Sequence, residues 1–526
     1  MLLQVNVRNF DFENFNFLGF VIVIAFIFSI FSRFLPSLSV YTTIFAFFSV
    51  VFISLFNNFK FNLNKYNVFA IVFVLNAIVS YYFADYKYNV RSEIFLLSSG
   101  VIIYLLTAFL SLSQKKIIIN TQIFIGLWLA IYIFTFNLSS DKFFDTNVIP
   151  YMNVYVCFLL VSFSLSFVFW NDERKIYKFL PYILFFAVLL TKFTIAIIIA
   201  CLVFATSIFF LKTHKIKTIF SLFFVLITIL YCYWLFKADF FTNKILVWKT
   251  ALFVIKDNFL VGVGFNNYKT VSGAYSLMKN VDVSSVDNIF LQVLCENGIF
   301  GFILFILVLI VFFYYVFKKI KENKNFYLSI LVACISFLVY NFFNSSAFIS
   351  TNMLLLFFIL AVPITQVKDI KKRKHKIDSH ILIILFLPFV FALGKPVYAN
   401  EQYKKGLYYF ANAKYPIAQD FFIDSIHNDS SNPESLAKLA DIYFYKYQKT
   451  KKKNFIVIAI NLYIRSLSLN KYNSNYYYQL AWLYSFYGNK ADVKKYIDKA
   501  ILVDPFNFLY YQHYDTLVNL GAADNV

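Results

Sequence analysis

The sequence has few charged residues. Only 14% of its 526 residues are Asp, Glu, Lys or Arg, whereas a soluble domain carries roughly 25%. By contrast 60% are hydrophobic and 71 are Phe. This composition excludes an ordinary soluble protein and predicts an integral membrane protein. The net charge of +21 does not point to nucleic acid, because the basic residues sit in short clusters between apolar runs, as they do in cytoplasmic loops.

Cysteine and histidine are also scarce, with five of each. Every cysteine lies in or beside an apolar segment, and no Cys/His spacing resembles a zinc site. We therefore expect no disulfide, no metal and no cofactor. The first sixteen residues do not form the basic region of a signal peptide, so the first apolar run is expected to be a retained membrane span.

Apolar runs of about the length that crosses a bilayer recur along the first 395 residues. We predict thirteen spans, near 17-35, 38-56, 67-84, 94-112, 117-136, 150-170, 178-191, 194-211, 218-236, 288-317, 327-343, 348-365 and 379-395. With a cytoplasmic N-terminus, the inside loops hold twenty Lys and Arg residues and the short outside loops five. That bias requires 178-211 to be two spans. It places the long loop at about 237-286 and everything after 395 outside the cytoplasm.

The tail, 396-526, is rich in Lys, Asn, Asp and Tyr, and it has no run long enough to span a membrane. Small and aromatic residues recur in it with a period of 34, and the pattern slips by about seven residues around "QKTKKKN". The period resembles the tetratricopeptide repeat, in which small residues let paired helices approach. The sequence thus predicts an all-α fold: a polytopic membrane domain over 1-395 and an extracytoplasmic helical solenoid that binds a protein partner. An unrelated helical bundle is the alternative.

Glycine is rare, and four of the twelve glycines cluster late in the membrane domain. Such clustering indicates sharp turns or close backbone packing. The positions are Gly262, Gly264, Gly298 and Gly301. The segment before them predicts an amphipathic helix on the membrane surface, with Ile245, Trp248, Leu252 and Ile255 on one face and Lys244, Lys249 and Lys256 towards others. These lysines either have a functional role or only extend from an interfacial helix towards water, which is called snorkelling.

A polar stripe enters the next span. Asn288, Gln292 and Glu296 are spaced by four, so they share one helix face. A carboxylate within a span costs about 2.5-3.5 kcal/mol at the membrane centre, so we expect Glu296 to face a cavity or a partner and not lipid. The stripe is either one wall of a donor pocket, with Gly298 and Gly301 letting a neighbouring helix approach, or a polar clasp between helices.

These residues carry a resemblance. Trp248 with a basic residue four positions before it, then "KDNFLVGVGFNNY", then "DNIFLQVLCENGIFG", resembles the core of the O-antigen ligase and polymerase superfamily, which includes bacterial protein O-oligosaccharyltransferases. The resemblance implies a multi-pass enzyme of the bacterial cytoplasmic membrane. It would move a glycan from a polyprenyl-diphosphate carrier to a glycan, lipid or protein acceptor without a metal.

The implied chemistry needs cations for the diphosphate and a base for the acceptor hydroxyl. Lys244, Lys249 and Lys256 are candidates for the first role and Asp287 for the second, with Lys192 as a further basic residue or an ordinary loop lysine. The superfamily typically has histidine where this chain has Asp287, and favours arginine where it has Lys244. Besides a ligase, the alternatives are a glycan polymerase and a non-catalytic envelope-assembly scaffold. A transporter would predict related halves, which the membrane part lacks.

Overall fold

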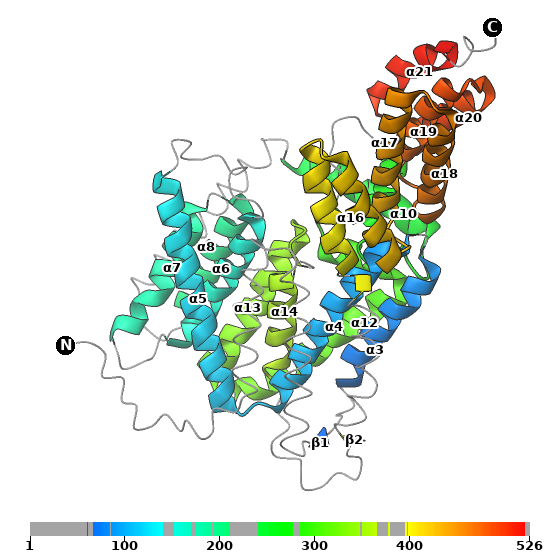
Figure 1. Ribbon diagram of the computed structural model, residues 1–526. Helices are drawn as coiled ribbons and strands as arrows, with labels where there is room; N and C mark the ends of the chain where they lie inside the picture. The colour runs from blue at the N-terminus through cyan, green and yellow to red at the C-terminus, as the bar shows by residue number, and fades with distance from the viewer. Residues whose placement is uncertain are drawn as a thin grey trace.

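The structure is a computed structural model. It describes residues 60–61, 67–84, 86–139, 152–169, 175–191, 193–210, 240–276, 285–347, 350–364, 377–378, 395–396 and 398–520. Within these ranges the chain is almost entirely helical (Figure 1).

Nine apolar helices of the described residues form the membrane part, and five of them are long and apolar enough to cross a bilayer by length and composition. They are α3 (Asn67–Phe83), α4 (Lys87–Phe109), α5 (Leu112–Ser139), α6 (Met152–Ser166), α7 (Leu180–Leu190), α8 (Thr194–Phe210), α12 (Ile289–Ile320), α13 (Lys324–Phe342) and α14 (Ser350–Ala361). Two short 3₁₀ turns, η3 (Phe167–Phe169) and η4 (Lys175–Phe179), follow α6 and precede α7. The chain is thus a multi-pass membrane protein.

Each of these nine helices matches a predicted span, and α7 and α8 are separate helices, as the charge bias requires. The other four predicted spans, 17-35, 38-56, 218-236 and 379-395, lie outside the described residues. The largest boundary error is at α4, which begins at Lys87, two turns before the predicted start at 94. Its extra turns are polar and extend beyond the apolar run. Helix α5 also begins early, at Leu112 and not near 117.

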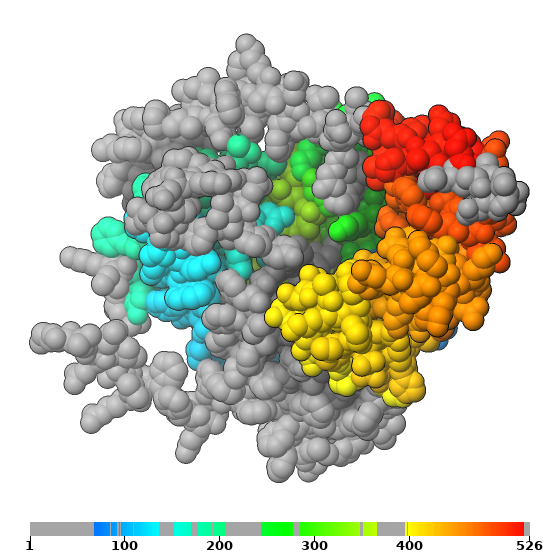
Figure 2. Space-filling model, turned by 45° about the horizontal axis from the view of Figure 1, so that its top comes forward, coloured from blue at the N-terminus to red at the C-terminus, as the bar shows by residue number. Residues whose placement is uncertain are grey.

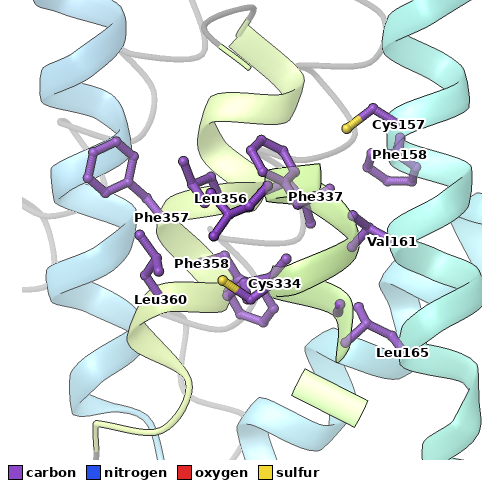
Figure 3. Close-up of a cluster of buried hydrophobic side chains, with 14 of the residues drawn as sticks. Cys157, Phe158, Val161, Leu165, Cys334, Phe337, Leu356, Phe357, Phe358 and Leu360 are labelled. Carbon is purple, nitrogen blue, oxygen red and sulfur yellow. The ribbon is translucent and has the colours of Figure 1, made fainter. Parts of the chain in front are cut away.

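Helix α6 is the centre of the membrane part. It packs against α5, α7, α8, α13 and α14, and nearly all of its side chains are buried. Figure 3 shows its Phe158 and Val161 facing residues of α13 and α14. Because lipid is as apolar as these side chains, close packing and buried polar pairs hold such helices together. One such pair joins the hydroxyls of Ser164 and Ser336, 3.0 Å apart.

The predicted cytoplasmic ends of the helices gather at one end of the molecule. There the buried Lys115 ammonium donates to the carbonyls of Val362 (3.0 Å) and Ile364 (2.7 Å), just beyond α14. A cation is favourable at a helix C-terminus. The two-residue strands β1 (Lys60–Phe61) and β2 (Ile377–Asp378) pair antiparallel at the same end (Figure 1). Both belong to predicted inside loops.

The opposite end carries the long loop and the tail. The loop contains α10 (Phe240–Asp257), α11 (Tyr268–Val271) and the 3₁₀ turn η5 (Ser272–Tyr275). Figure 2, with this end turned forward, shows the tail helices grouped on one side with loop residues beside them. The loop and the tail therefore lie at the same end of the membrane part.

The tail is a series of antiparallel helices. Residues 398–411 are helical and are followed by α16 (Tyr415–Asn428), α17 (Pro433–Thr450), α18 (Lys453–Leu469), α19 (Ser474–Tyr487), α20 (Lys490–Val503) and α21 (Phe508–Leu520). The turn inside each of the first three pairs holds a residue with positive φ: Ala413, Lys451 and Gly488. In the first pair the helices meet closely at a small residue, since a Cβ added to Gly406 would lie 2.6 Å from the Phe422 ring.

The predicted seven-residue slip has a simple structural cause. Helices α17 and α18 have 18 and 17 residues, whereas α19 and α20 have 14 each, a difference of 4 + 3 = 7. Both pairs are joined by two-residue turns, so the extra residues add about one helical turn to each member of the middle pair. The repeat is therefore lengthened and not interrupted.

Candidate functional site

The polar stripe and the glycines meet where α12 is broken. Gly298 has φ 63° and ψ −170°, a conformation that is essentially restricted to glycine. The break leaves the carbonyls before it without their helical partners. A loop takes their place: the amides of Val263 and Gly264 donate to the carbonyls of Cys295 (2.9 Å) and Glu296 (3.0 Å). The Ile299 amide donates in turn to the carbonyl of Phe259 (2.9 Å).

Close backbone contact explains the glycines of this loop. Gly262 and Gly264 both have positive φ. A Cβ at Gly262 would lie 2.5 Å from the carbonyl oxygen of Glu296, and one at Gly298 would lie 2.2 Å from that of Leu260. Residues 258–264 and the break in α12 thus pack backbone against backbone.

The two later glycines, Gly298 and Gly301, have different neighbours. Gly301 does lie at a helix contact, since a Cβ there would meet the Asn76 amide of α3 at 2.7 Å. Gly298, in contrast, admits the 258–264 loop and not a neighbouring helix. The interpretation of Gly298 as a helix-packing glycine is therefore corrected.

Helix α10 is amphipathic, but its faces differ from the prediction. Ala251, Val254 and Ile255 are buried against the loop and α12, and Val247 is buried too, whereas Ile245 and Leu252 are 46% and 53% exposed. The predicted apolar face is therefore partly buried in the protein and partly exposed. Trp248 lies between the two faces, and its ring contacts Phe342 and Phe343 at the end of α13.

The lysines of α10 also separate. Lys244 is half-buried beside the turn that leads into α12. Lys249 and Lys256 are exposed, on the same face of α10 as Ile245 and Leu252. The structure therefore brings only Lys244 to Asp287. Lys192 lies outside the described residues.

Asp287 occupies a strained turn and is held by two groups. Its φ of 51° is left-handed, a region in which Asp, Asn and His are enriched among non-glycine residues. Its carboxylate forms an ion pair with the Lys244 ammonium and accepts a hydrogen bond of 2.7 Å from the Ser285 hydroxyl. Both charged side chains are mostly buried, at 16% exposure for Lys244 and 23% for Asp287. This is a fixed acid–cation pair at the interface between the loop and the membrane part.

The three residues of the stripe have different surroundings. Asn288 caps α12, because its side-chain oxygen accepts from the amides of Phe290 (2.9 Å) and Leu291 (3.1 Å). Gln292 is half-buried one turn later, and Glu296 is 2% exposed just before the break. Glu296 thus faces protein and not lipid, as expected. Because capping occupies the Asn288 oxygen, Asn288 has a structural role whether or not it binds a substrate.

Several buried polar groups around this stripe have no hydrogen-bond partner among the described residues. They are the Tyr268 hydroxyl, the Gln292 side-chain oxygen, the Asn297 carboxamide and the Trp248 indole N–H. Buried polar groups are normally paired with protein or water. This concentration therefore indicates a place where water or a polar ligand binds.

Tyr268 is the main residue that the sequence interpretation missed. Tyr268 is 1% exposed, and burial raises the pKa of its hydroxyl, as do Cys295, Asp287 and Glu296 nearby. It remains a neutral hydrogen-bond donor at all physiological pH values. Its place in "GFNNY" beside the glycines was the available signal.

Two α3 residues were missed as well. The Ser80 hydroxyl donates to the Glu296 carbonyl (3.3 Å) and the Asn76 amide to the Asn297 carbonyl (3.5 Å). They help to hold the break open. No sequence signal marks them, because they lie within an otherwise apolar span 216 and 221 residues away.

The residues described offer no group of three or more His, Cys, Asp or Glu side chains that could hold a metal ion. What they offer is a cation, a carboxylate and neutral donors at a membrane interface. Such a set suits a substrate that carries negative charge and hydroxyl groups.

Comparison with known families gives a match over part of the chain. Residues 155–306 match the family model described as O-Antigen ligase, a range that runs from α6 through α10 and the 285–288 turn into α12. No curated protein matched the chain. The family match supports placement in the O-antigen ligase superfamily, whose members are glycosyltransferase-like ligases and polymerases. It supports membrane glycosyl transfer or polymerisation on a lipid-linked glycan.

Proposed function

We propose that the protein transfers a glycan from a polyprenyl-diphosphate carrier to an acceptor hydroxyl, at the site formed by α10, α11 and the 285–288 turn. The observation that carries this proposal is the ion pair of Lys244 and Asp287 within the region that matches the O-antigen ligase family. It sets a cation and a base side by side at the membrane interface, where a lipid-linked donor would present its diphosphate.

The proposed reaction is a direct displacement. The acceptor hydroxyl oxygen attacks the anomeric carbon, and its proton passes to the Asp287 carboxylate. The bond between that carbon and the phosphate oxygen breaks, and the polyprenyl diphosphate leaves with the electron pair. Attack opposite the leaving group inverts the anomeric centre.

Lys244 would have two partners in this reaction. It neutralises Asp287 before the donor arrives, and it stabilises charge on the diphosphate as the donor leaves. As the ammonium turns towards the phosphate, the carboxylate is released from the ion pair and can contact the acceptor hydroxyl. Tyr268 would donate a hydrogen bond to the substrate, because its buried hydroxyl has no partner among the described residues.

The remaining candidate residues surround this centre. Lys249 and Lys256, exposed beside apolar residues of α10, would attract the donor headgroup at the membrane surface. Gln292 and Glu296 would form the inner wall, with Asn288 holding the start of α12. Lys192 stays a predicted donor contact.

We also propose that the tail is an extracytoplasmic tetratricopeptide domain over 396-526 and that the enzyme resides in the bacterial cytoplasmic membrane. The repeated turns support the first part. An Asn side chain caps both α17 and α19, at Asn432 and Asn473, and each follows a polar C-cap residue by three positions, Asp429 and Asn470.

A second candidate function is a non-catalytic scaffold. The observation that favours it is Asp287 itself, which stands where the superfamily typically has histidine and is engaged by Lys244. A polymerase that extends the carrier-linked chain is the alternative within the enzyme class.

Purified protein mixed with carrier-linked glycan and candidate acceptors tests the proposal. Glycan on the acceptor with release of carrier diphosphate supports a ligase, and longer carrier-linked chains support a polymerase. In cells that lack the gene, unligated carrier-linked glycan should accumulate. Unchanged cellular glycans together with no transfer in vitro would contradict an enzymatic role.

A further inference from the structure

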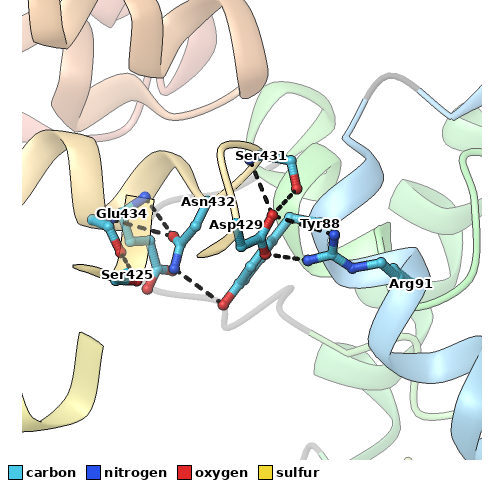
Figure 4. Close-up of polar contacts among 8 residues, drawn as sticks. Tyr88, Arg91, Ser425, Asp429, Ser431, Asn432 and Glu434 are labelled. Carbon is cyan, nitrogen blue, oxygen red and sulfur yellow. Dashed lines mark hydrogen bonds and ion pairs between the residues drawn. The ribbon is translucent and has the colours of Figure 1, made fainter. Parts of the chain in front are cut away.

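The polar first turns of α4 touch the tail. The Arg91 guanidinium binds the Asp429 carboxylate through two nitrogens, one of them 3.2 Å from Oδ1 (Figure 4). The same carboxylate accepts hydrogen bonds from the amide (3.1 Å) and hydroxyl (2.7 Å) of Ser431. With its side chain only 3% exposed, Asp429 is a fully satisfied buried acid. Planar two-point pairs of this kind fix orientation as well as contact.

A second bond joins the same turn to the start of α17. The Tyr88 hydroxyl accepts from the Asn432 side-chain amide at 3.3 Å. Asn432 is also the cap of α17, since its oxygen accepts from the amides of Glu434 (3.0 Å) and Ser435 (3.3 Å). The membrane part is thus hydrogen-bonded to the turn between the first two tail hairpins.

Residues 86–91, which bond to the tail, also bond to the loop that contains Tyr268. The Asn267 side-chain amide donates to the carbonyl of Tyr86 (2.7 Å), and the Asn89 amide donates to the Thr270 hydroxyl (3.3 Å). Asn267 and Thr270 flank Tyr268. Residues 86–91 are therefore bonded to the tail on one side and to the Tyr268 loop on the other.

A separate tail contact reaches the same loop. Tyr472, in the turn before α19, packs against the cluster that contains Tyr268, Val271, Val286 and Cys295. Helix α20 lies beside η5, where the carbonyl oxygen of Val503 would be 3.9 Å from a Cβ on Gly273. Two tail segments far apart in sequence therefore lie against the site region.

We propose that the tail is a docked wall of the candidate site, and that Arg91 is a positioning residue that fixes the tail and the Tyr268 loop to each other. It acts through Asp429 and has no contact with the substrate. The docking rests on the contacts above. Its kinetic consequence, a weaker hold on the acceptor when the tail is loosened, rests on the proposed function.

Hydrogen–deuterium exchange on the full-length protein in detergent tests the docking without any need for activity. Arg91→Met removes both charged hydrogen bonds, so the backbone amides within 429–435, apart from Pro433, should exchange on the order of tenfold faster. Amides of Thr270 and Val271, which bond to the Asn267 carbonyl, should speed up with them. The matched control is Lys495→Met, which removes an exposed tail ion pair with Asp492 and should change neither region.

Exchanging the charges of Arg91 and Asp429 distinguishes loss of this ion pair from misfolding of a single variant. Arg91→Asp and Asp429→Arg should each loosen both regions, and the double variant should restore protection at least in part. If Arg91→Met leaves both regions protected, the docking is wrong. If 429–435 loosens while 267–271 stays protected, the positioning role is wrong.

The kinetic arm separates positioning from plain structure. For an active protein, Arg91→Met should raise the KM for the acceptor several-fold with kcat and the donor KM little changed, and Arg91→Lys should lie between. Equal loss for donor and acceptor would overturn the assignment to acceptor positioning. If no transfer is found even with the unmodified protein, the proposed function fails and the exchange result still decides the docking.

Discussion

The Lys244 ammonium and the Asp287 carboxylate, 43 residues apart, form an ion pair that joins α10 to the turn before α12. The pair is mostly shielded from solvent, so each partner depends on the other for charge compensation. In the proposed reaction Lys244 neutralises the base and also binds the anionic donor, so a neutral side chain cannot replace it.

Lys244→Met should therefore abolish transfer and destabilise the protein by about 1–3 kcal/mol, because among the described residues it leaves the mostly buried carboxylate with Ser285 as its one remaining side-chain partner. Lys244→Arg should keep both, since guanidinium stays charged and fits carboxylate and phosphate. Thermal unfolding in detergent and a transfer assay measure the two effects. Lys249→Met and Lys256→Met, at exposed positions, are the controls for stability. Equal destabilisation by all three Met variants would contradict the special position of Lys244.

Asp287→Asn should remove nearly all transfer while protein level and donor binding persist. Asparagine keeps the shape and tolerates the left-handed backbone, but it cannot accept the proton. Asp287→His should retain or raise activity, because histidine also accepts this conformation and is the usual residue of the superfamily at this point.

Two outcomes of this pair would be decisive. Transfer by Asp287→Asn at close to the unmodified rate excludes Asp287 as the base. No transfer by the unmodified protein and none by Asp287→His favours the scaffold. Donor binding, measured on the same preparations, shows that the site is still formed.

Gly298→Ala should be among the most damaging single-methyl changes in the chain. Its Cβ would meet the Leu260 carbonyl oxygen at 2.2 Å in a conformation that only glycine adopts readily. Strain and overpacking each cost about 1–3 kcal/mol, so a loss of about 2 kcal/mol or more is expected. Gly273→Ala is the matched control, since its nearest contact is an ordinary 3.9 Å. Similar thermal midpoints for the two variants would contradict the tight loop–helix contact.

The membrane helices were predictable because apolar length is a strong signal, and nine predicted spans coincide with helices of the described residues. The start of α4 was not predictable in this way, because its first turns are polar and one of their residues, Arg91, binds Asp429, 338 residues away. Long-range polar contacts of this kind leave no local pattern in the sequence.

The candidate site was predictable in composition and not in geometry. The glycine cluster marked the right segments. The sequence around Gly298 nevertheless predicts a continuous helix, because nothing in it shows that the loop 258–264 bonds to the backbone at that point. For the same reason Asn288 looked like part of a stripe, although it caps the helix, and Tyr268 looked like a loop aromatic. The sequence shows that Lys249 and Lys256 lie on a different face of α10 from Lys244. It does not show which of these faces is buried, so it could not predict that Lys244 is the lysine that reaches Asp287.

Reporter fusions test the shared side of the loop and the tail. A reporter after Gly394 and one inserted near Ser272 should both behave as extracytoplasmic, because the positive-inside bias and the contact between α20 and η5 place them together. A reporter inserted at Glu322, between α12 and α13, should behave as cytoplasmic. The same response at Glu322 and Ser272 would break the topology and with it the donor-site assignment.

The tail should lose stability at alkaline pH because of buried tyrosines around Glu434. Burial raises the pKa of Tyr403 and of Tyr476, and the Glu434 carboxylate raises both further. An unfolded tyrosine has a pKa near 10. Folded-state values above that mean that the stabilisation is complete below about pH 10 and is lost as pH rises towards the folded-state pKa.

Tyr403→Phe removes one of these protons, so the stability of the tail above pH 10 should fall less steeply by about 1.4 kcal/mol per pH unit. The urea-sensitive part of the helical circular dichroism signal, followed between pH 8 and 11 in the full-length protein, measures this slope. Tyr408→Phe is the matched control, since that side chain is 67% exposed and its ring projects away from the core. A slope that is unchanged by Tyr403→Phe, or changed equally by Tyr408→Phe, would show that the buried tyrosines do not set the alkaline limit. A shallower slope for Tyr403→Phe alone would locate that limit at the hydroxyls that surround Glu434, between the first two hairpins of the tail.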